Sequence, residues 1–274
     1  MPARFVYRLI VILSLVSVFV SSAQTSEDIL QRVLNNKAFS WLSYSSQNIK
    51  IYYQKDSFAQ QHKSMLLRSI EKSVEEVLDT LHESASERLL SVFYVESREE
   101  MEQMIGYPVT GYAAWGVNAM FLVVNPEWRS FEKHEFAHIV TMGRWGRPAG
   151  SSRWMTEGIA IFCDGCCREY TVDEVAYALL KSGQLPALIK FFGNFSELGE
   201  IKAGFYAGSL IGFINERYGI ETVRRLWQSG TGNIKEILGS ETDQIEIMWK
   251  NYLKEKFRDN IEVDLKTISE LGCG

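Results

Sequence analysis

The chain has 274 residues, of which 46% are hydrophobic and 12% aromatic, so it can build a sizeable core in one large domain or in two small lobes. Its formal net charge of -5 is modest and it has no long basic run, which argues against a nucleic-acid-binding protein. No internal repeat or low-complexity segment is present.

Residues 1–23 have the pattern of a secretory signal peptide. Arg4 and Arg8 flank an apolar run at Leu9–Val20, and small residues follow at Ser21–Ala23. An uncleaved membrane anchor is the alternative, but this run is shorter than the roughly 20 residues that a spanning helix needs. We expect cleavage near Ala23 and export to a periplasmic or extracellular compartment, with no stable membrane span and a lead-in segment at 24–47.

The first half of the mature chain predicts alternating strands and helices. The segment at 48–53 alternates apolar and polar residues, as a half-buried strand does, and the helix after it carries aliphatic residues four positions apart. The expected elements are a short helix at 26–38, a strand at 48–53, a helix at 58–81, a strand at 89–95, a helix at 97–105 and two strands within 111–124. Asn125 and Pro126 are expected to begin the next helix as its N-cap and first-turn proline.

That next helix contains the sequence HEFAH at His134–His138. Residues four apart share one face of a helix, so both imidazoles can reach a single metal ion. Glu135 lies one position round from His134, where a general base for a metal-bound water belongs.

A catalytic zinc site normally has three protein ligands, and the sequence restricts the third. The only other histidines, His62 and His82, lie far upstream in a polar helical stretch. Thr141 and Arg144 occupy the positions where a metzincin needs glycine and histidine, so that class is excluded. A carboxylate remains, and Glu157 is the best placed: eighteen residues separate it from His138, and Ser151 or Ser152 can cap a second helix before it.

The rest of the chain is predicted to be almost entirely helical. A Thr-x-x-Glu capping box at Thr171 and Glu174 begins the first of these helices. The predicted helices span 171–181, 185–192, 204–218, 221–228, 233–238 and 243–257. We therefore expect an α+β lobe, whose sheet lies against the HEFAH helix, and a second all-helical lobe, with a cleft between them.

Four cysteines remain after export, which in an oxidising compartment indicates disulfide bonds. They are Cys163, Cys166, Cys167 and Cys273. A second metal site at Cys163–Cys167 is disfavoured because no further histidine or second CxxC accompanies it. A bridge from this cluster to Cys273 would pin the C-terminal tail near the helix that carries Glu157, but which cysteine forms it is left open.

HEFAH, an eighteen-residue spacing and a glutamate in the context WMTEGIA resemble the gluzincin metallopeptidases. More narrowly, residues 48–258 are similar to the peptidase MA-like domains, relatives of thermolysin and aminopeptidase N. The resemblance implies a zincin-like fold, with a metallopeptidase domain at 48–260 and a tail at 261–274. It also implies one Zn²⁺ per chain, bound by His134, His138 and Glu157.

In this interpretation the protein hydrolyses peptide bonds with a zinc-activated water, and Glu135 is the general base. Relatives of this type use a tyrosine or histidine on a later helix to stabilise the oxyanion; Tyr206 is the candidate, and a core-facing tyrosine is the alternative. An extended peptide or protein substrate is expected to pair with a strand edge, at Tyr112–Trp115 or Met120–Val123. No GxMEN-type motif precedes HEFAH, which favours endopeptidase over aminopeptidase action.

Two other function classes stay open. One is a catalytically weak or inactive domain that binds a protein partner, and the other is a zinc hydrolase of a non-peptide amide or ester. Zinc content and the activity of Glu135→Gln separate the first from an enzyme, and a peptide-library digest separates the second. The sequence does not predict the oligomeric state.

Overall fold

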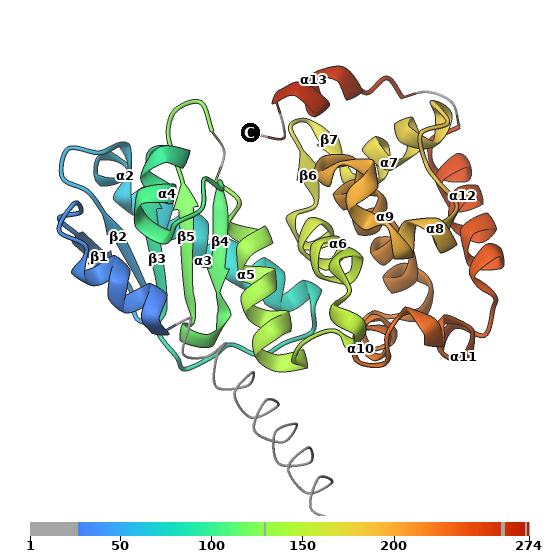
Figure 1. Cartoon of the computed structure of the whole chain (residues 1–274), viewed down its shortest axis with the longest axis horizontal. Helices are drawn as coiled ribbons and strands as arrows, with labels where there is room; N and C mark the ends of the chain where they lie inside the picture. The colour runs from blue at the N-terminus through green and yellow to red at the C-terminus, as the bar shows by residue number, and fades with distance from the viewer. Residues whose placement is uncertain (1–26, 129, 259–260, 272, 274) are drawn as a thin grey trace, which may run out of the picture. The chain divides into compact units, whose positions relative to one another are not determined.

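The computed structural model describes residues 27–128, 130–258, 261–271 and 273 (Figure 1). The predicted signal peptide at 1–23 lies outside these residues. The chain divides into two compact units. The first contains the described residues up to Leu67 together with Glu87–Asn125, and the second contains Arg68–Ser86 and the described residues from Pro126 onward. No helix in the described part of the chain is long and apolar enough to cross a membrane.

A five-stranded mixed sheet forms the first unit, in the order β1-β2-β3-β5-β4. Its strands are β1 (Leu42–Ser45), β2 (Ile49–Tyr53), β3 (Leu90–Val95), β4 (Gly111–Ala114) and β5 (Ala119–Val123). The three central strands run parallel, while β1 and β4 pair antiparallel at the two edges. The predictions of β2, β3, β4 and β5 are confirmed. β1 was not predicted, because its four residues are all exposed and carry no periodic apolar signal.

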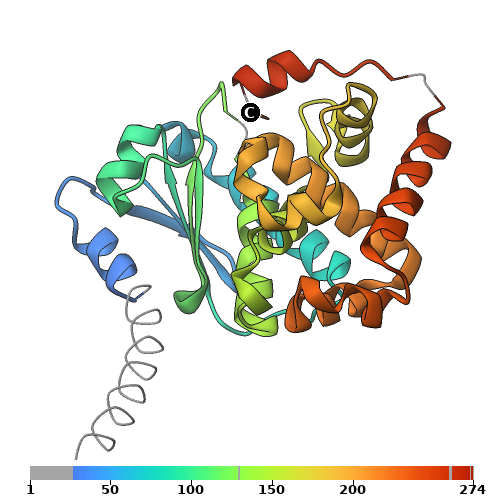
Figure 2. The same cartoon turned by 45° about the vertical axis from the view of Figure 1, so that its right-hand side comes forward.

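One face of this sheet carries the core of the first unit. Phe93 of β3 and Phe121 of β5 are paired in register, with ring centroids 5.1 Å apart. Helix α4 (Arg98–Ile105) packs on them through buried methionines, and the helix at 27–35 adds Val33 to the same cluster. Figure 2 shows both helices on the same side of the sheet. Ser97 caps α4 by accepting the N–H of Glu100.

The long helix predicted at 58–81 is broken into α2 (Phe58–Gln61) and α3 (Lys63–Thr80). His62 lies at the break, where its ring nitrogen hydrogen-bonds the Phe58 carbonyl oxygen at 2.9 Å and its ring stacks on Phe58. The apolar periodicity runs through both helices, so it does not reveal this local interruption. Most of α3 belongs to the second unit.

The second unit is helical apart from a two-stranded ribbon, β6 (Cys166–Cys167) with β7 (Tyr170–Thr171). Its helices begin with α5 (Glu132–Val140), which continues as the π-helical turn η2 (Thr141–Trp145), and α6 (Arg153–Asp164). The later helices are α7 (Val172–Lys181), α8 (Leu188–Gly193), α9 (Glu200–Tyr218), α10 (Ile220–Ser229), α11 (Ile234–Leu238), α12 (Thr242–Phe257) and α13 (Leu265–Leu271). The capping box that begins α7 is confirmed, since Thr171 and Glu174 each accept a backbone N–H of the other.

Helices α6 and α9 lie side by side because glycines allow close approach (Figure 1). A Cβ on Gly158 of α6 would lie 2.9 Å from the Ala207 Cβ, and one on Gly208 of α9 would lie 2.6 Å from the Ile161 Cγ2. Neither position has room for a larger side chain. This contact fixes the helix that carries Glu157.

Candidate metal centre

The two histidines of HEFAH lie one turn apart on α5, as predicted. The helix begins later than expected. Phe131 is at the N-cap position and Glu132 is the first helical residue, so the predicted start at Asn125 and Pro126 is wrong. Asn125 instead donates its side-chain amide to the Glu96 carbonyl oxygen at 2.8 Å, and a turn follows at 126–127. An Asn-Pro pair is as favourable in a turn as at the start of a helix, and in this structure it lies in a turn.

The first turn of α5 is tied to α3 by polar contacts. The Glu132 carboxylate is 6% exposed and accepts hydrogen bonds from the hydroxyls of Ser69 (2.6 Å) and Ser73 (3.3 Å). Next to it, Lys133 pairs with Glu76 at 3.4 Å. Phe136, on the buried side of α5, is 7% exposed. These contacts therefore anchor the first turn of the helix that carries the two histidines.

Glu157 reaches the two histidines from the second turn of α6. Ser152 occupies the N-cap position of this helix, although its side chain makes no capping hydrogen bond. The Glu157 Oε2 atom lies 3.5 Å from the His134 Nε2 and 3.8 Å from the His138 Nε2. The two Nε2 atoms are 3.2 Å apart. His134, His138 and Glu157 thus form a group that can hold a metal ion.

These separations can be compared with the geometry of known metal sites. Bonds of 2.0–2.1 Å at tetrahedral angles place two ligand atoms about 3.3 Å apart, whereas right-angled octahedral ligands would lie about 3.0 Å apart. The separations of 3.2, 3.5 and 3.8 Å fit the tetrahedral arrangement better. Both histidine side chains are 16% exposed and that of Glu157 is 31% exposed, so solvent can reach the group. A fourth, open position is consistent with this exposure.

The protonation states of the metal-free group follow from its geometry. Burial alone lowers the pKa of His134, but the hydrogen bond to Glu157 and the nearby carboxylate charges raise it to about 9. Burial and the charge of His134 lower the pKa of His138 to about 4. Burial alone raises the pKa of Glu157, yet the hydrogen bond from His134 and the histidine charges bring it down to about 2. Without a metal, His134 and Glu157 are an ion pair beside a neutral His138.

Glu135 lies beside the group and is only 7% exposed. Burial, together with the charges of Glu157 and Asp164, raises its pKa to about 7, while the charge of His134 opposes this. A carboxyl group that titrates near neutral pH can accept and return a proton. A bound cation would lower this pKa, because it favours the ionised form. Glu135 is therefore the group of α5 best suited to acid–base chemistry.

Two further charged residues of α6 act on the site. Asp164 is 2% exposed, and its charge raises the pKa of both His134 and Glu135. At the other end of the helix, one turn before Glu157, Arg153 helps to lower the pKa of that carboxylate.

Tyr206 has the contacts of a core residue. It is fully buried, its hydroxyl donates to the Pro186 carbonyl oxygen at 2.8 Å, and its ring stacks between Phe191 and Trp249. Burial raises the pKa of this phenol above its ordinary value. These contacts favour the alternative left open by the sequence, a core-facing tyrosine, over a donor to a reacting oxyanion.

One cysteine of the cluster bonds Cys273 in the C-terminal tail, as predicted, and the structure shows which one it is. Cys167 and Cys273 form a disulfide across 106 residues of sequence, while the buried Cys163 and the partly exposed Cys166 are not disulfide-bonded. Among the described residues, His134, His138 and Glu157 are the only group of three ligand residues able to hold a metal. This group does not include His62, His82 or any of the cysteines.

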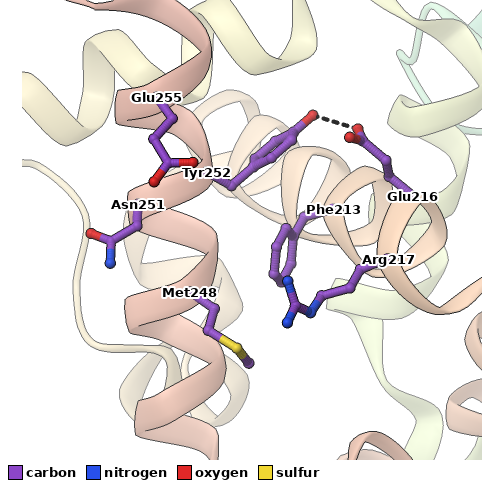
Figure 3. Close-up of a pocket in the computed structure, with 7 residues that line it drawn as sticks. All are labelled: Phe213, Glu216, Arg217, Met248, Asn251, Tyr252 and Glu255. Atoms are coloured by element: carbon purple, nitrogen blue, oxygen red, sulfur yellow. Dashed lines mark hydrogen bonds between the residues drawn. The ribbon is translucent and has the colours of Figure 1, made fainter.

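Another concavity lies between α9 and α12, with a volume of about 290 Å³ (Figure 3). Figure 3 shows the Tyr252 hydroxyl directed at Glu216, to which it donates a hydrogen bond of 2.8 Å. Phe213 forms its apolar floor, whereas Glu216, Arg217 and Glu255 are exposed. It contains no histidine or cysteine and does not include any member of the metal group.

No protein-family model matches the chain, and no curated protein matches it. The functional interpretation therefore depends on the site.

Proposed function

We propose that the protein is a zinc-dependent metallopeptidase of the gluzincin type, with His134, His138 and Glu157 as the metal ligands. One observation carries this proposal: three ligand atoms at near-tetrahedral spacing, with a buried glutamate adjacent in sequence to the first histidine. The WMTEGIA context of Glu157 resembles the gluzincins and supports the same assignment.

The choice of zinc follows from the donor set. Two imidazole nitrogens and one carboxylate oxygen are the ligands of catalytic zinc in peptidases of the thermolysin type. A non-haem iron site uses the same donors but in an octahedral face, which fits the separations less well.

When bound, zinc supplies a Lewis acid that polarises a carbonyl group and acidifies water. The side chain of Glu135 then has two tasks: it removes a proton from the attacking water and delivers it to the leaving amine. Its burial beside His134 suits both tasks, since the carboxyl group neither ionises too readily nor holds its proton too tightly. The charge of Asp164, which is buried in the same unit, helps to raise the pKa of the His134 imidazole.

The sheet topology supports one of the two strands considered for substrate pairing. β5, which contains Met120–Val123, has neighbours on both sides, so its backbone groups are already paired. β4 pairs only with β5 among the described strands and is thus an edge strand, the position at which an extended peptide can add to a sheet. Of the two predicted segments, we therefore favour Tyr112–Trp115 for substrate pairing.

The proposal is tested by zinc content together with a peptide-library digest of the purified protein. We expect one zinc per chain and cleavage within peptides, both lost in Glu157→Ala. Glu135→Gln should keep its zinc and lose about 10²- to 10⁴-fold in turnover. Glu132→Gln is the matched control: this buried glutamate of the same helix accepts from Ser69 and Ser73, and the glutamine oxygen can still accept there, so the variant should retain both zinc and turnover.

Each contrary result has a distinct meaning. Zinc binding without hydrolysis of any peptide would favour an inactive domain that binds a partner, or a hydrolase of another amide or ester. Full turnover in Glu135→Gln would remove Glu135 from the reaction. Unchanged zinc affinity in Glu157→Ala would remove Glu157 from the ligand set.

A further inference from the structure

Glu83, in the connection that follows α3, gathers three donors from two other elements of its unit. Its carboxylate accepts hydrogen bonds from the Arg144 Nη1 (2.9 Å) and the Trp145 Nε1 (2.7 Å), both in η2. The third donor is the Arg224 guanidinium of α10. The Glu83 side chain is 13% exposed, whereas Arg144 and Arg224 are 28% and 27% exposed, so these charge-assisted bonds are partly shielded from water.

Aromatic contacts surround these hydrogen bonds to Glu83. The rings of Trp145 and Trp227 meet edge to face with centroids 5.9 Å apart, and the Arg224 guanidinium lies 5.1 Å from the Trp145 ring centre. Trp227 also donates its indole N–H to the Gly146 carbonyl oxygen at 2.9 Å. The end of η2 is thus held against α10 at several points at once.

The turn held in this way is continuous with the metal-binding turn of α5. The Thr141 N–H is shared between the carbonyl oxygens of Ala137 and His138, and the Thr141 hydroxyl donates to Ala137 at 2.8 Å. From this point the chain follows a π-helical course to Trp145. Such departures from α-helical geometry are uncommon and are frequent at functional sites. A shift of η2 therefore reaches His138 through its own backbone.

We propose that Glu83 is a positioning residue for the metal centre: by fixing Arg144 and Trp145 it sets the π-helical turn that orients His138. This inference rests on the metal site of the proposed function, but not on peptide hydrolysis. Glu83 touches none of the three ligands, and its effect passes through η2.

Glu221 provides a matched control. It pairs with the same Arg224, at 3.6 Å, but from the surface of α10, where its side chain is 67% exposed. Replacing Glu221 removes a carboxylate from Arg224 and leaves the bonds from η2 to Glu83 in place.

The test measures zinc affinity by competition with a chelator at a temperature where every variant is folded. We expect Glu83→Gln to bind zinc at least about tenfold more weakly, the lower end of the effect of groups that support metal ligands indirectly. Glu221→Gln should bind zinc as the wild type does. The visible spectrum of the cobalt-substituted protein should change in Glu83→Gln alone, because it reports the coordination geometry.

If Glu83→Gln melts earlier yet binds zinc with wild-type affinity and an unchanged cobalt spectrum, Glu83 is merely structural and the inference is overturned. If this variant does not fold, Trp145→Phe removes a single donor to Glu83 and gives the same contrast. A wild type that binds zinc but cleaves no peptide refutes the proposed function and leaves this inference standing. A wild type without zinc affinity refutes both.

Discussion

At the scale of single residues, removing the Tyr206 hydroxyl group distinguishes a packing role for this residue from a catalytic one. Tyr206→Phe leaves the ring between Phe191 and Trp249 but removes the donor to the Pro186 carbonyl oxygen. This hydrogen bond is only partly buried, so its loss should lower the free energy of unfolding by about 0.5–1.5 kcal/mol, measured by urea denaturation. Turnover should stay within a few-fold of wild type. A loss of about 10²- to 10³-fold would instead assign Tyr206 to the oxyanion, as the sequence predicted.

The difference between Tyr206 and the metal group shows what a motif can predict at this scale. His134 and His138 are brought together by helical periodicity alone, and Glu157 by a spacing that leaves room for one loop. The direction of Tyr206 depends on how α9 is rotated about its axis. That rotation is set by Gly204 and Gly208 against Ile161, a contact that no local pattern encodes.

At the scale of elements, the close contact of α6 with α9 is predicted to limit both stability and metal affinity. In Gly208→Ala the new methyl group would lie 2.6 Å from the Ile161 Cγ2 and 3.0 Å from its Cβ, a branched position with little freedom. Overpacking of this kind costs about 1–3 kcal/mol, against about 1 kcal/mol gained from helix propensity. We expect a lower melting temperature and weaker zinc binding, since Ile161 lies one turn after Glu157.

Gly212→Ala is the control for this contact. Its Cβ would meet the Phe162 ring at 3.4 Å, an ordinary contact distance. The variant should be as stable as the wild type or slightly more stable, with unchanged zinc affinity. Equal melting temperatures for Gly208→Ala and wild type would show that α6 shifts freely, contrary to the packing argument.

The contacts of Glu83 with Arg144, Trp145 and Arg224 are predicted to make the stability of this unit sensitive to acid. Burial alone raises the pKa of Glu83, but hydrogen bonds from Trp145 and Arg144 and the charge of Arg224 outweigh it and hold the pKa below its ordinary value of 4.5. The stabilisation by a carboxylate with a lowered pKa is present above the unfolded value and is lost as the pH falls through the folded one. The melting temperature of wild type should therefore exceed that of Glu83→Gln above about pH 5.5, and the gap should narrow below pH 4.5. A constant gap down to pH 3 would contradict this.

Several elements show why boundaries were harder to predict than the elements themselves. The strands β2, β3 and β5 and the capping box of α7 have strong local signals, and all are present. The N-cap of α5 was misplaced by six residues, at Asn125 instead of Phe131, because Asn-Pro suits both a cap and a turn. A long-range hydrogen bond from the Asn125 side chain to the Glu96 carbonyl oxygen favours the turn over the helix cap.

At the scale of the whole molecule, the sequence predicted both the α+β character and the helical second half, because these depend on periodicities summed over many residues. The choice among three cysteines for Cys273 could not be predicted in the same way. It depends on where β6 leaves α6: Gly165, with a φ of +83°, ends the helix and turns Cys167 into a cluster with Val172, Phe205 and Ile268.

The disulfide is predicted to be a main tie of the C-terminal tail to the second unit. Cys167 and Cys273 are separated by 106 residues, and a cross-link over a loop of that length stabilises by about 4–5 kcal/mol in the chain-entropy description. Cys273→Ala should lower the melting temperature and expose Ile268, which is 2% exposed in the intact protein, to limited proteolysis in the tail. Cys166→Ala is the control, because Cys166 is next to the bonded cysteine but outside the disulfide, and it should melt as wild type. If a reductant lowers the melting temperature of Cys273→Ala as much as that of wild type, the effect of the reductant lies elsewhere and the bridge does not stabilise the fold.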